Sequence, residues 1–390
     1  MGARSTPPAG CTDGNFVSEW FGHRVWSVVS DSEQARSDQS GRLCPFLTVA
    51  IGETTHCVKR VSGWSEPYGV CTISSDSNGS RQEWIACPYR TLDQHFTLLE
   101  TSVNHAFGVR ADTETLLLPL TVLHRQDQRK RIRDALSSKA RAFLFSATKL
   151  GGEIELPETE ASPGAAVDMS VIEVLGLDKE GKPSKFGKHL FYEIQTADFH
   201  GSPLHAAKLL RKSCPKDAGG DGYHDDLKRR VEICGTGVEG PNKANIFKRT
   251  IYQMIYKIEL AQAAECAGFA IVLPMPVWES WLKHLGKPKL EVKPGDEAIY
   301  QMRAPKSAPT KSSKRARAMV YVFDINTGAA ESPSPLKIVR RVEVSADALA
   351  HHAFVKASDE AIRRGVVGKF RKSMIARISN GWKNKLPKLK

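Results

Sequence analysis

The stretch Phe191-Tyr192-Glu193-Ile194-Gln195 is the part of the sequence from which we infer the fold, and it ends an apolar segment that begins at His189. Apolar and aromatic residues over this segment predict a β-strand from 189 to 195. Side chains of a strand alternate between its two faces, so Glu193 and Gln195 should project from the same face. The prediction therefore places a carboxylate and an amide together on one side of a sheet.

A second carboxylate lies in the preceding apolar segment, which predicts a strand over 167–174. Asp168 is near the start of this segment, where a carboxylate costs free energy unless it is paired or binds a cation. Glu153 begins a further predicted strand, over 153–156. Glu153, Asp168 and Glu193 together offer the hard oxygen ligands that Mg²⁺ prefers. Spacing alone leaves two interpretations open: a metal-dependent nuclease site, or three unrelated surface carboxylates.

The segments around these carboxylates predict an α/β (or α+β) fold in which helices flank a mixed central sheet. Apolar residues at helical spacing predict one helix over 127–149, ended by Gly151-Gly152, and a longer one over 245–266. Further strands are predicted over 268–273 and 319–325. Trp278 and Trp281 are spaced like residues of the core.

The N-terminal part of the chain differs in composition. Residues from Asn15 to about Arg110 are rich in Trp, Cys, Gly and Ser, and turn residues separate their short segments. Short strands are predicted at 45–49 and 70–73. Residues 1–14 contain Gly, Pro and Ser without an apolar stretch, so we expect a disordered N-terminus and no secretory signal.

Four of the eight cysteines, Cys44, Cys57, Cys71 and Cys87, fall within 44 residues. Four converging thiolates would suit Zn²⁺ or iron in a closed, structural site. The gaps of 12, 13 and 15 residues contain no Cys-x-x-Cys pair, however, so four unrelated buried thiols are an equal alternative. Cys44 and Cys87 each precede a proline, which fixes the chain directly after the candidate ligand.

The chain is basic, with 56 Lys and Arg against 43 Asp and Glu in 390 residues, a formal net charge of +13. This excess favours a polyanionic partner. Basic residues gather in a predicted exposed loop, 304–316, and in a tail, 361–390, which has ten Lys and Arg and no acid. No apolar stretch approaches the roughly 20 residues of a membrane span, which excludes a transmembrane helix. Sparse cysteines suit a cytoplasmic chain with reduced thiols.

Beyond these local patterns, the sequence resembles the NotI-type restriction endonucleases. The matching motifs are collinear from Asn15 to Pro288, an arrangement that chance does not produce, whereas the basic C-terminal third matches more loosely. They include Cys44-Pro45-Phe46-Leu47-Thr48, Cys87-Pro88, Lys149-Leu150-Gly151-Gly152-Glu153, Glu193-Ile194-Gln195-Thr196, Asp198-Phe199-His200-Gly201-Ser202, Gly240-Pro241-Asn242, Phe247-Lys248-Arg249-Thr250 and Tyr252-Gln253-Met254.

The resemblance implies a PD-(D/E)XK nuclease core over residues 116–390, with an active site of Glu153, Asp168, Glu193 and Gln195. Mg²⁺ would be held by Asp168 and Glu193, with the carbonyl of Ile194. Two residues depart from the pattern, because Asp168 follows Val rather than Pro and Gln195 occupies the position usually held by Lys. An amide can orient a water molecule but supplies no positive charge, so Gln195 cannot replace that lysine electrostatically.

The same resemblance implies that residues 15–115 form a metal-binding and DNA-recognition region. Its metal would be iron, with zinc as the alternative, held by Cys44, Cys57, Cys71 and Cys87. The loop between Cys57 and Cys71 is longer than in the type member, which leaves the ligands in place.

DNA contacts are implied for Asn242, Asn245, Lys248 and Arg249, at the start of the longer predicted helix. The implied activity is Mg²⁺-dependent hydrolysis of double-stranded DNA at a GC-rich palindrome, leaving 5′-phosphate ends. A palindrome suits a symmetric homodimer. A cognate DNA methyltransferase acting on the same site would protect the bacterial host's own DNA.

Two other functions remain open from the sequence. A non-catalytic, sequence-specific DNA-binding protein with a structural Cys₄ metal site has no need of acids placed against phosphate. An iron–sulfur redox protein would normally contain Cys-x-x-Cys pairs, which the clustered cysteines lack. The carboxylate set therefore favours the endonuclease.

Overall fold

The computed structural model describes residues 14–25, 30, 32–62, 64–77, 79–212, 237–303 and 317–382. The predicted basic loop, 304–316, lies outside the described residues, as do residues 1–13 of the predicted disordered N-terminus and the last eight residues of the basic tail.

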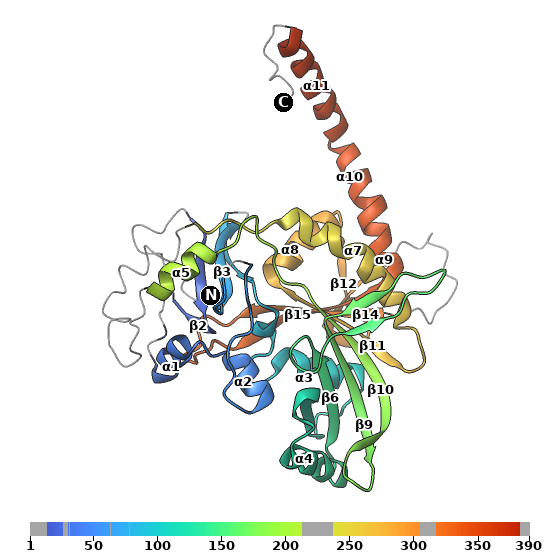
Figure 1. Ribbon diagram of the computed structural model, residues 1–390. Coiled ribbons are helices and arrows are strands. Elements are labelled where there is room, and N and C mark those ends of the chain that lie inside the picture. The colour runs from blue at the N-terminus through green and yellow to red at the C-terminus, as the bar shows by residue number, and fades with distance from the viewer. Residues whose placement is uncertain are drawn as a thin grey trace.

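A nine-stranded mixed sheet forms the centre of the molecule (Figure 1). The parallel strands β10, β11 and β14 lie in the middle, and β9 runs antiparallel to β10. The large mixed sheet flanked by helices confirms the predicted α/β class. Its strands, in spatial order, are β12 (Leu290–Lys293), β13 (Asp296–Met302), β15 (Leu336–Ser345), β14 (Arg317–Ile325), β11 (Cys266–Pro274), β10 (Pro183–Ile194), β9 (Met169–Leu177), β6 (Arg141–Ala147) and β5 (Thr115–Pro119).

Helices cover both faces of this sheet because its central strands are apolar on both sides. In β11, Ala270 and Val272 pack into the core that contains α3 (Thr97–Ala106), whereas Phe269, Ile271 and Leu273 pack into the core of α7 and α8. Trp278 and Trp281 are buried in this second core, as predicted. The helices on that side are α7 (Lys243–Leu260), α8 (Met275–His284) and α9 (Ala346–Ala350), and α4 (Gln126–Ser137) packs on β5 and β6.

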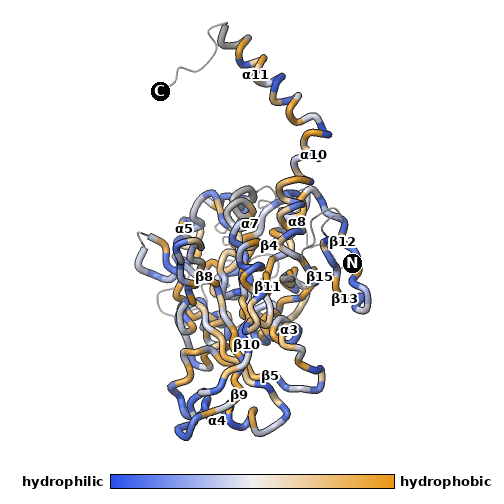
Figure 2. Tube along the Cα trace, turned by 90° about the vertical axis from the view of Figure 1, so that its right-hand side faces the viewer, coloured by the Kyte–Doolittle hydropathy of each residue, from blue (hydrophilic) through white to orange (hydrophobic). Residues whose placement is uncertain are grey.

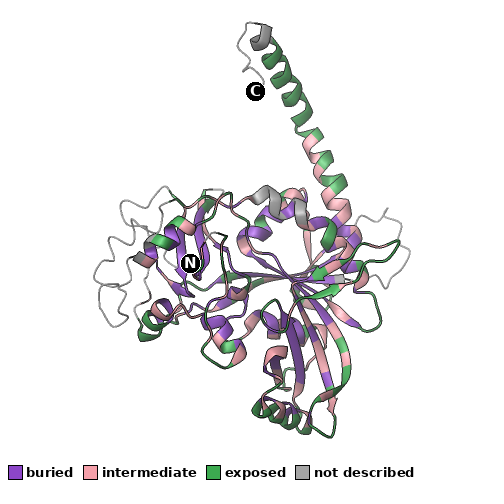
Figure 3. Ribbon diagram, in the orientation of Figure 1, coloured by how far each residue is buried: buried purple, intermediate pink, exposed green. Residues whose placement is uncertain are grey.

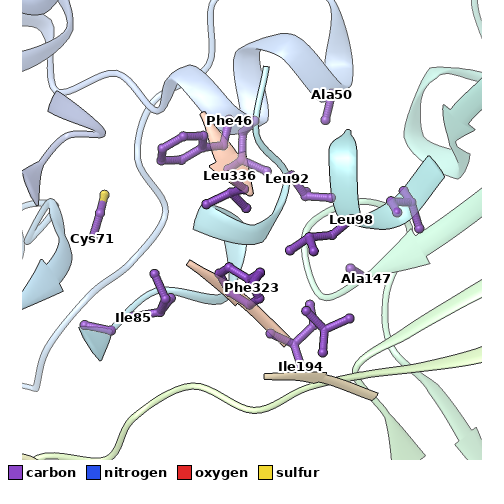
Figure 4. Close-up of a cluster of buried hydrophobic side chains, with 14 of the residues drawn as sticks. Phe46, Ala50, Cys71, Ile85, Leu92, Leu98, Ala147, Ile194, Phe323 and Leu336 are labelled. Carbon is purple, nitrogen blue, oxygen red and sulfur yellow. The ribbon is translucent and has the colours of Figure 1, made fainter. Parts of the chain in front are cut away.

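The N-terminal region contains a separate four-stranded sheet, in the order β2-β1-β3-β4. Its apolar side chains nevertheless share one core with the large sheet. Figure 4 shows Phe46 and Ala50 in one cluster with Leu98, Ala147 and Ile194. The elements here are β1 (Phe16–Trp20), β2 (His23–Arg24), α1 (Glu33–Gly41), α2 (Pro45–Ile51), β3 (Val70–Ser77), β4 (Ser80–Ile85) and the 3₁₀ turn η1 (Pro88–Thr91).

Buried polar bonds also tie the N-terminal region to the connection between β14 and β15. Arg90 forms a bidentate ion pair with Glu19 (2.7 and 3.0 Å) and donates to the carbonyl of Ser334 (2.6 Å). His23 Nε2 lies 2.8 Å from Asp38 Oδ2, and His23 Nδ1 lies 2.7 Å from the hydroxyl oxygen of Ser332. These contacts hold the region that contains the clustered cysteines against the central sheet.

Two predictions of secondary structure were wrong. Residues 45–49 form the helix α2 rather than a strand, with Pro45 in its first turn and Gly52 as its left-handed C-cap. An apolar run of this length does not distinguish a buried helix from a strand, and proline at the first helical position decides for the helix. The predicted helix 127–149 is the helix α4 followed by the strand β6, because Phe143 and Phe145 face one core while Ala142 and Leu144 face another.

The predicted helix 245–266 ends earlier than expected, at Leu260. Residues 262, 263 and 266 donate turn-type hydrogen bonds after it, and Cys266 already begins β11. The remaining elements are η2 (Leu120–Val122), β7 (Ile154–Leu156), β8 (Ala165–Val167) and α5 (Leu204–Lys212).

The C-terminal part of the described chain leaves the body as an arm. A π-helical turn, η4 (His351–Lys356), leads into α10 (Ala357–Arg363) and α11 (Val366–Trp382), which project into solvent (Figures 1 and 2). None of the described helices is both long and apolar enough to cross a membrane.

We expect replacement of Arg90 by methionine to lower the free energy of unfolding by about 3–5 kcal/mol, because Glu19 would keep a buried charge without its partner. Urea denaturation followed by circular dichroism measures the loss. The control is Arg110→Met, which removes an ion pair with Asp112 from a guanidinium that is 82% exposed and should change little. An equally small effect of both substitutions would contradict the structural role of the Glu19–Arg90 pair.

Candidate active site and cysteine cluster

The predicted carboxylates lie at one edge of three neighbouring strands. Glu153 follows the end of β6, Asp168 directly precedes β9, and Glu193 is the second-last residue of β10. The strand register brings these ends together, because Met169 pairs with Ala147 of β6 on one side and with Tyr192 of β10 on the other. Residues that are separated by up to 40 positions in the sequence therefore meet at one place.

Asp168 is held by the backbone of the neighbouring strand. Its Oδ2 accepts a hydrogen bond from the N–H of Ile194 at 2.8 Å. Burial raises the pKa of this carboxyl, and the amide of Ile194 and the charge of Lys257 partly oppose that rise. Glu153 acts in the same direction as burial, since its negative charge also raises the pKa of Asp168.

Glu193 forms a buried ion pair with Lys257 of α7. Lys257 Nζ donates to Glu193 Oε2 at 2.6 Å, and the two side chains are only 3% and 5% exposed. Gln195 lies on the same face, with its amide nitrogen 3.5 Å from Glu193 Oε1, as the strand periodicity predicted. Burial raises the pKa of Glu193 to about 7, and the charge of Asp168 adds to this, while Lys257 lowers it.

Glu153 is the exposed member of the set and accepts a hydrogen bond from the hydroxyl of Thr148. It begins a small hairpin, β7–β8, that ends immediately before Asp168. The tip of the hairpin is tied to α7, because the Tyr256 hydroxyl bonds Ser162 and donates to the carbonyl of Pro163 at 3.0 Å. Helix α7 thus supports both sides of the site, through Tyr256 and through Lys257.

Lys257 is a residue of this site that the sequence patterns did not indicate. It lies beside the apolar positions Met254 and Ile258, which pack into the core beneath α7. A lysine at the border of an apolar helix face usually extends its ammonium group to solvent. Only the packing of α7 against β10 shows that this ammonium meets a carboxylate instead.

The side chains of this site carry more negative than positive charge, which would favour a bound cation. Asp168, Glu193 and Glu153 bring three carboxylates to one strand edge, and Lys257 supplies a single positive charge to Glu193. Burial raises the pKa values of both Asp168 and Glu193, and a neighbouring carboxylate adds to each rise: Glu153 for Asp168, and Asp168 for Glu193. This is the effect of excess negative charge. Hard oxygen donors with surplus negative charge fit Mg²⁺.

The four clustered cysteines line one small cavity, together with Phe21, Tyr89 and other residues. All four are buried and free of disulfide bonds. Both Cys-Pro pairs have the same local structure, since Cys44 precedes the first turn of α2 and Cys87 precedes η1. Cys71 is on β3, where its carbonyl accepts from the N–H of Cys87 at 3.3 Å. The sequence-predicted set is therefore brought together in space.

Backbone amides are directed at these sulfurs. The N–H of Gly22 lies 3.2 Å from Cys71 Sγ, and the amides of Phe46 and Leu47 bond Cys44. Burial, and then the charge of Cys87, nevertheless raises the pKa values of Cys44 and Cys71 well above those of ordinary thiols. The amides stabilise thiolates, whereas the thiolates repel one another. A cation that binds sulfur would remove this repulsion, so the arrangement fits such a cation.

Within the described residues, no three His, Cys, Asp or Glu side chains form a ready-made metal site. For the carboxylates, a cation would be held by two side chains with a main-chain carbonyl. For the cysteines, the four thiols that line the small cavity are the candidate ligands.

The predicted DNA contacts are described only in part. Asn242 precedes α7, and its backbone N–H donates to the carbonyl of Asp198 at 2.7 Å. The side chains of Asn245, Lys248 and Arg249 lie outside the described residues, although their backbone belongs to α7. The helix that would carry them also carries Tyr256 and Lys257, so it connects the predicted contacts to the carboxylates.

No protein-family model and no curated protein sequence matches the chain.

Proposed function

We propose that this protein is a Mg²⁺-dependent type II restriction endonuclease with a PD-(D/E)XK active site at Asp168, Glu193 and Lys257. The observation that carries the proposal is the buried Glu193–Lys257 pair beside Asp168 at the end of the central sheet. Strongly perturbed carboxylates with a buried cation are typical of catalytic sites, and a protein that only binds DNA has no need of them.

Asp168 and Glu193 would hold Mg²⁺, together with the carbonyl of Ile194. When bound, the cation would neutralise charge on the scissile phosphate and lower the pKa of a coordinated water. The protein contributes the geometry, because the amide of Ile194 fixes Asp168 and the ammonium of Lys257 fixes Glu193. Both carboxylates are thereby oriented before substrate arrives.

Lys257 would take over the electrostatic task that Gln195 cannot perform. Its ammonium opposes the rise that burial causes in the pKa of Glu193, and it would add positive charge beside the position of the phosphate. Gln195, which lies next to Glu193, would orient a water molecule with its amide. Glu153 is exposed and can accept the proton of that water or bind a second cation.

The other parts of the proposal concern binding. The cysteine cluster would hold iron or zinc and stabilise the N-terminal region against the sheet. Asn242, Asn245, Lys248 and Arg249 would contact double-stranded DNA at a GC-rich palindrome, and the basic tail would attract phosphate in a salt-dependent way. A homodimer in the bacterial cytoplasm, with a cognate methyltransferase acting on the same site, completes the proposal.

We expect Asp168→Asn and Glu193→Gln to lower the rate of DNA cleavage about 10³-fold or more, because each removes a ligand charge worth several kcal/mol to the transition state. Lys257→Met should lower the rate by about 10²-fold or more. All three variants should still shift DNA in a gel. Digestion of plasmid and phage DNA in the presence of Mg²⁺ measures the rates.

The turn between β9 and β10, at the far end of the strands, provides matched controls. Lys182 lies 2.6 Å from Glu180 there, but the two side chains are 58% and 70% exposed. Glu180→Gln and Lys182→Met make the same chemical changes and should cut at the wild-type rate. Wild-type cutting by Asp168→Asn would refute the assignment of the site, and DNA binding by a wild type that never cuts would favour the non-catalytic DNA-binding function.

We expect the purified full-length protein to contain about one iron or zinc ion per chain, because four buried thiols with amide donors are typical of a structural site. Cys71→Ser should lose most of this metal and unfold at a lower temperature. Cys266→Ser is the control, because Cys266 is a buried thiol of β11 outside the cluster. Elemental analysis gives the metal content. A wild-type protein without metal, or an equal loss of metal in both variants, would contradict the proposed metal site.

A further inference from the structure

A basic pocket opens at the base of the arm, between the loop that follows α8 on one side and η4 with α10 on the other. Its volume is about 410 Å³, which is in the size range of small-molecule sites in proteins. Neither the carboxylates of the candidate active site nor the clustered cysteines line it. The charged residues that line it are Lys287, Lys289, Lys356, Arg363, Asp359 and Glu360.

Positive charge predominates in the lining of the basic pocket, which has four cations and two acids. One of the acids is already paired, because Glu360 forms ion pairs with both Arg363 and Arg364 of the same helix. Within the part of the chain that the structure describes, no acid lies within ion-pair distance of the three lysines, and no cation lies within that distance of Asp359. Three ammonium groups and one carboxylate are therefore available to a ligand.

The loop after α8 holds its two lysines on a fixed backbone. Gly286 and Lys287 are both left-handed, with φ values of 70° and 54°. A residue other than glycine is uncommon in this conformation and keeps it only where the surrounding structure requires it. Here the N–H of Lys287 donates to the carbonyl of Leu282 at 2.7 Å, so the turn that ends α8 is closed by a hydrogen bond. Pro288 then restricts the backbone between Lys287 and Lys289.

The opposite wall of the basic pocket packs directly against this loop. A Cβ atom added to Gly286 would lie 3.2 Å from the backbone nitrogen of Ala357 and 3.3 Å from the carbonyl carbon of Lys356. His352 also lines this wall, and its Nε2 lies 3.2 Å from the carbonyl oxygen of Arg303. Partly buried residues at the base of the arm show the packing, whereas the described side chains of α11 are exposed (Figure 3).

The π-helical turn adds a second indication of function at this wall. Such turns are rare, and they occur frequently at functional sites. Lys356 is the last residue of the turn η4, so the turn ends at a cation of the basic pocket. Two unusual backbone conformations, the left-handed Lys287 and the π-helical η4, thus carry lysines into one pocket from opposite sides.

The chemistry of the lining favours phosphate over other anions. Lysine binds phosphate as a point charge, and a phosphate monoester carries between one and two negative charges near neutral pH, with several acceptor oxygens. Three free lysines can share these oxygens, whereas a single carboxylate offers only two. The volume of the basic pocket also exceeds what one phosphate group needs, so it leaves room for the rest of the ligand.

We propose that the basic pocket binds a phosphate group, with Lys287, Lys289 and Lys356 as its cationic ligands. This inference goes beyond the proposed function, because phosphate binding at the base of the arm requires neither Mg²⁺ nor cleavage. A free nucleotide and the backbone of a DNA strand both present the same group. Binding measurements with each of them separate these two sources.

The first test is isothermal titration calorimetry of the full-length protein with adenosine 5′-monophosphate, in buffer without Mg²⁺. Lys289→Gln and Lys356→Gln each remove one ligand charge, so each should weaken binding about fivefold or more. Lys283→Gln is the matched control, because Lys283 is an exposed lysine near the end of α8 that does not line the basic pocket. Adenosine, which lacks the phosphate, should not bind.

Asp359 provides a test in the opposite direction. Its carboxylate faces the same pocket and repels a bound phosphate. Asp359→Asn should therefore bind the phosphate ligand several-fold more tightly than the wild type does. A gain of affinity cannot result from misfolding, so this variant tests the site even if a lysine variant is unstable.

The second test uses a short DNA duplex in the same buffer and identifies the source of the phosphate. If the DNA backbone supplies it, Lys289→Gln and Lys356→Gln should weaken duplex binding more than Lys283→Gln does. Each should also reduce the dependence of log K on log salt by about 0.9. If a free nucleotide supplies it, both variants should weaken binding of adenosine 5′-monophosphate and leave duplex binding at the wild-type level.

Three results would overturn the proposal. The first is that Lys289→Gln and Lys356→Gln affect neither ligand more than Lys283→Gln does. The second is equal binding of adenosine and adenosine 5′-monophosphate, which would show that the phosphate is not recognised. The third is weaker phosphate binding by Asp359→Asn than by the wild type. All of these measurements are made without Mg²⁺ and without cleavage, so failure of the phosphate site and failure of the proposed nuclease are distinguishable.

Discussion

The interaction on which the rest of the structure depends is the ion pair between Lys257 and Glu193 inside the protein. Its two side chains are almost completely buried. Removing a carboxylate and an ammonium from water costs several kcal/mol per ion, so the pair is tolerated only when both groups are held at bonding distance. That requirement holds α7 against the end of β10. Met254 and Ile258 of the same helix pack into the core beside Lys257. Tyr256 bonds the hairpin that separates Glu153 from Asp168.

A shared core and a second buried ion pair connect the N-terminal region to the central sheet. The apolar core that contains Ile194 also contains Phe46 and Cys71 of the N-terminal region (Figure 4), and the buried Glu19–Arg90 pair reaches the carbonyl of Ser334. Ile194, which follows Glu193, and Cys71 of the cysteine cluster therefore belong to one shared core. In the function that we propose, a metal at the cysteines would keep the DNA-recognition region in register with the centre that cuts.

The sequence allowed prediction of those features that depend on local periodicity. Glu193 and Gln195 do lie on one face, and Asp168 is in the strand region that its apolar neighbours indicated. Residues 45–49 and 138–149 were assigned wrongly, because short apolar runs fit helix and strand equally and the outcome depends on which cores they join. Lys257 could not be found, since nothing in a helix's own sequence shows which strand it will cover. The basic pocket could not be found either, since Lys287 and Lys356 belong to distant segments of the sequence.

Anomalous diffraction from crystals of the full-length protein soaked in Mn²⁺ tests the central claim most directly, because Mn²⁺ occupies the oxygen sites that suit Mg²⁺. The account predicts an anomalous peak between the carboxylates of Asp168 and Glu193, close to the carbonyl of Ile194. A peak elsewhere, with Asp168 and Glu193 bound only to the amide of Ile194 and to Lys257, would contradict it and leave the buried pair as a structural ion pair alone.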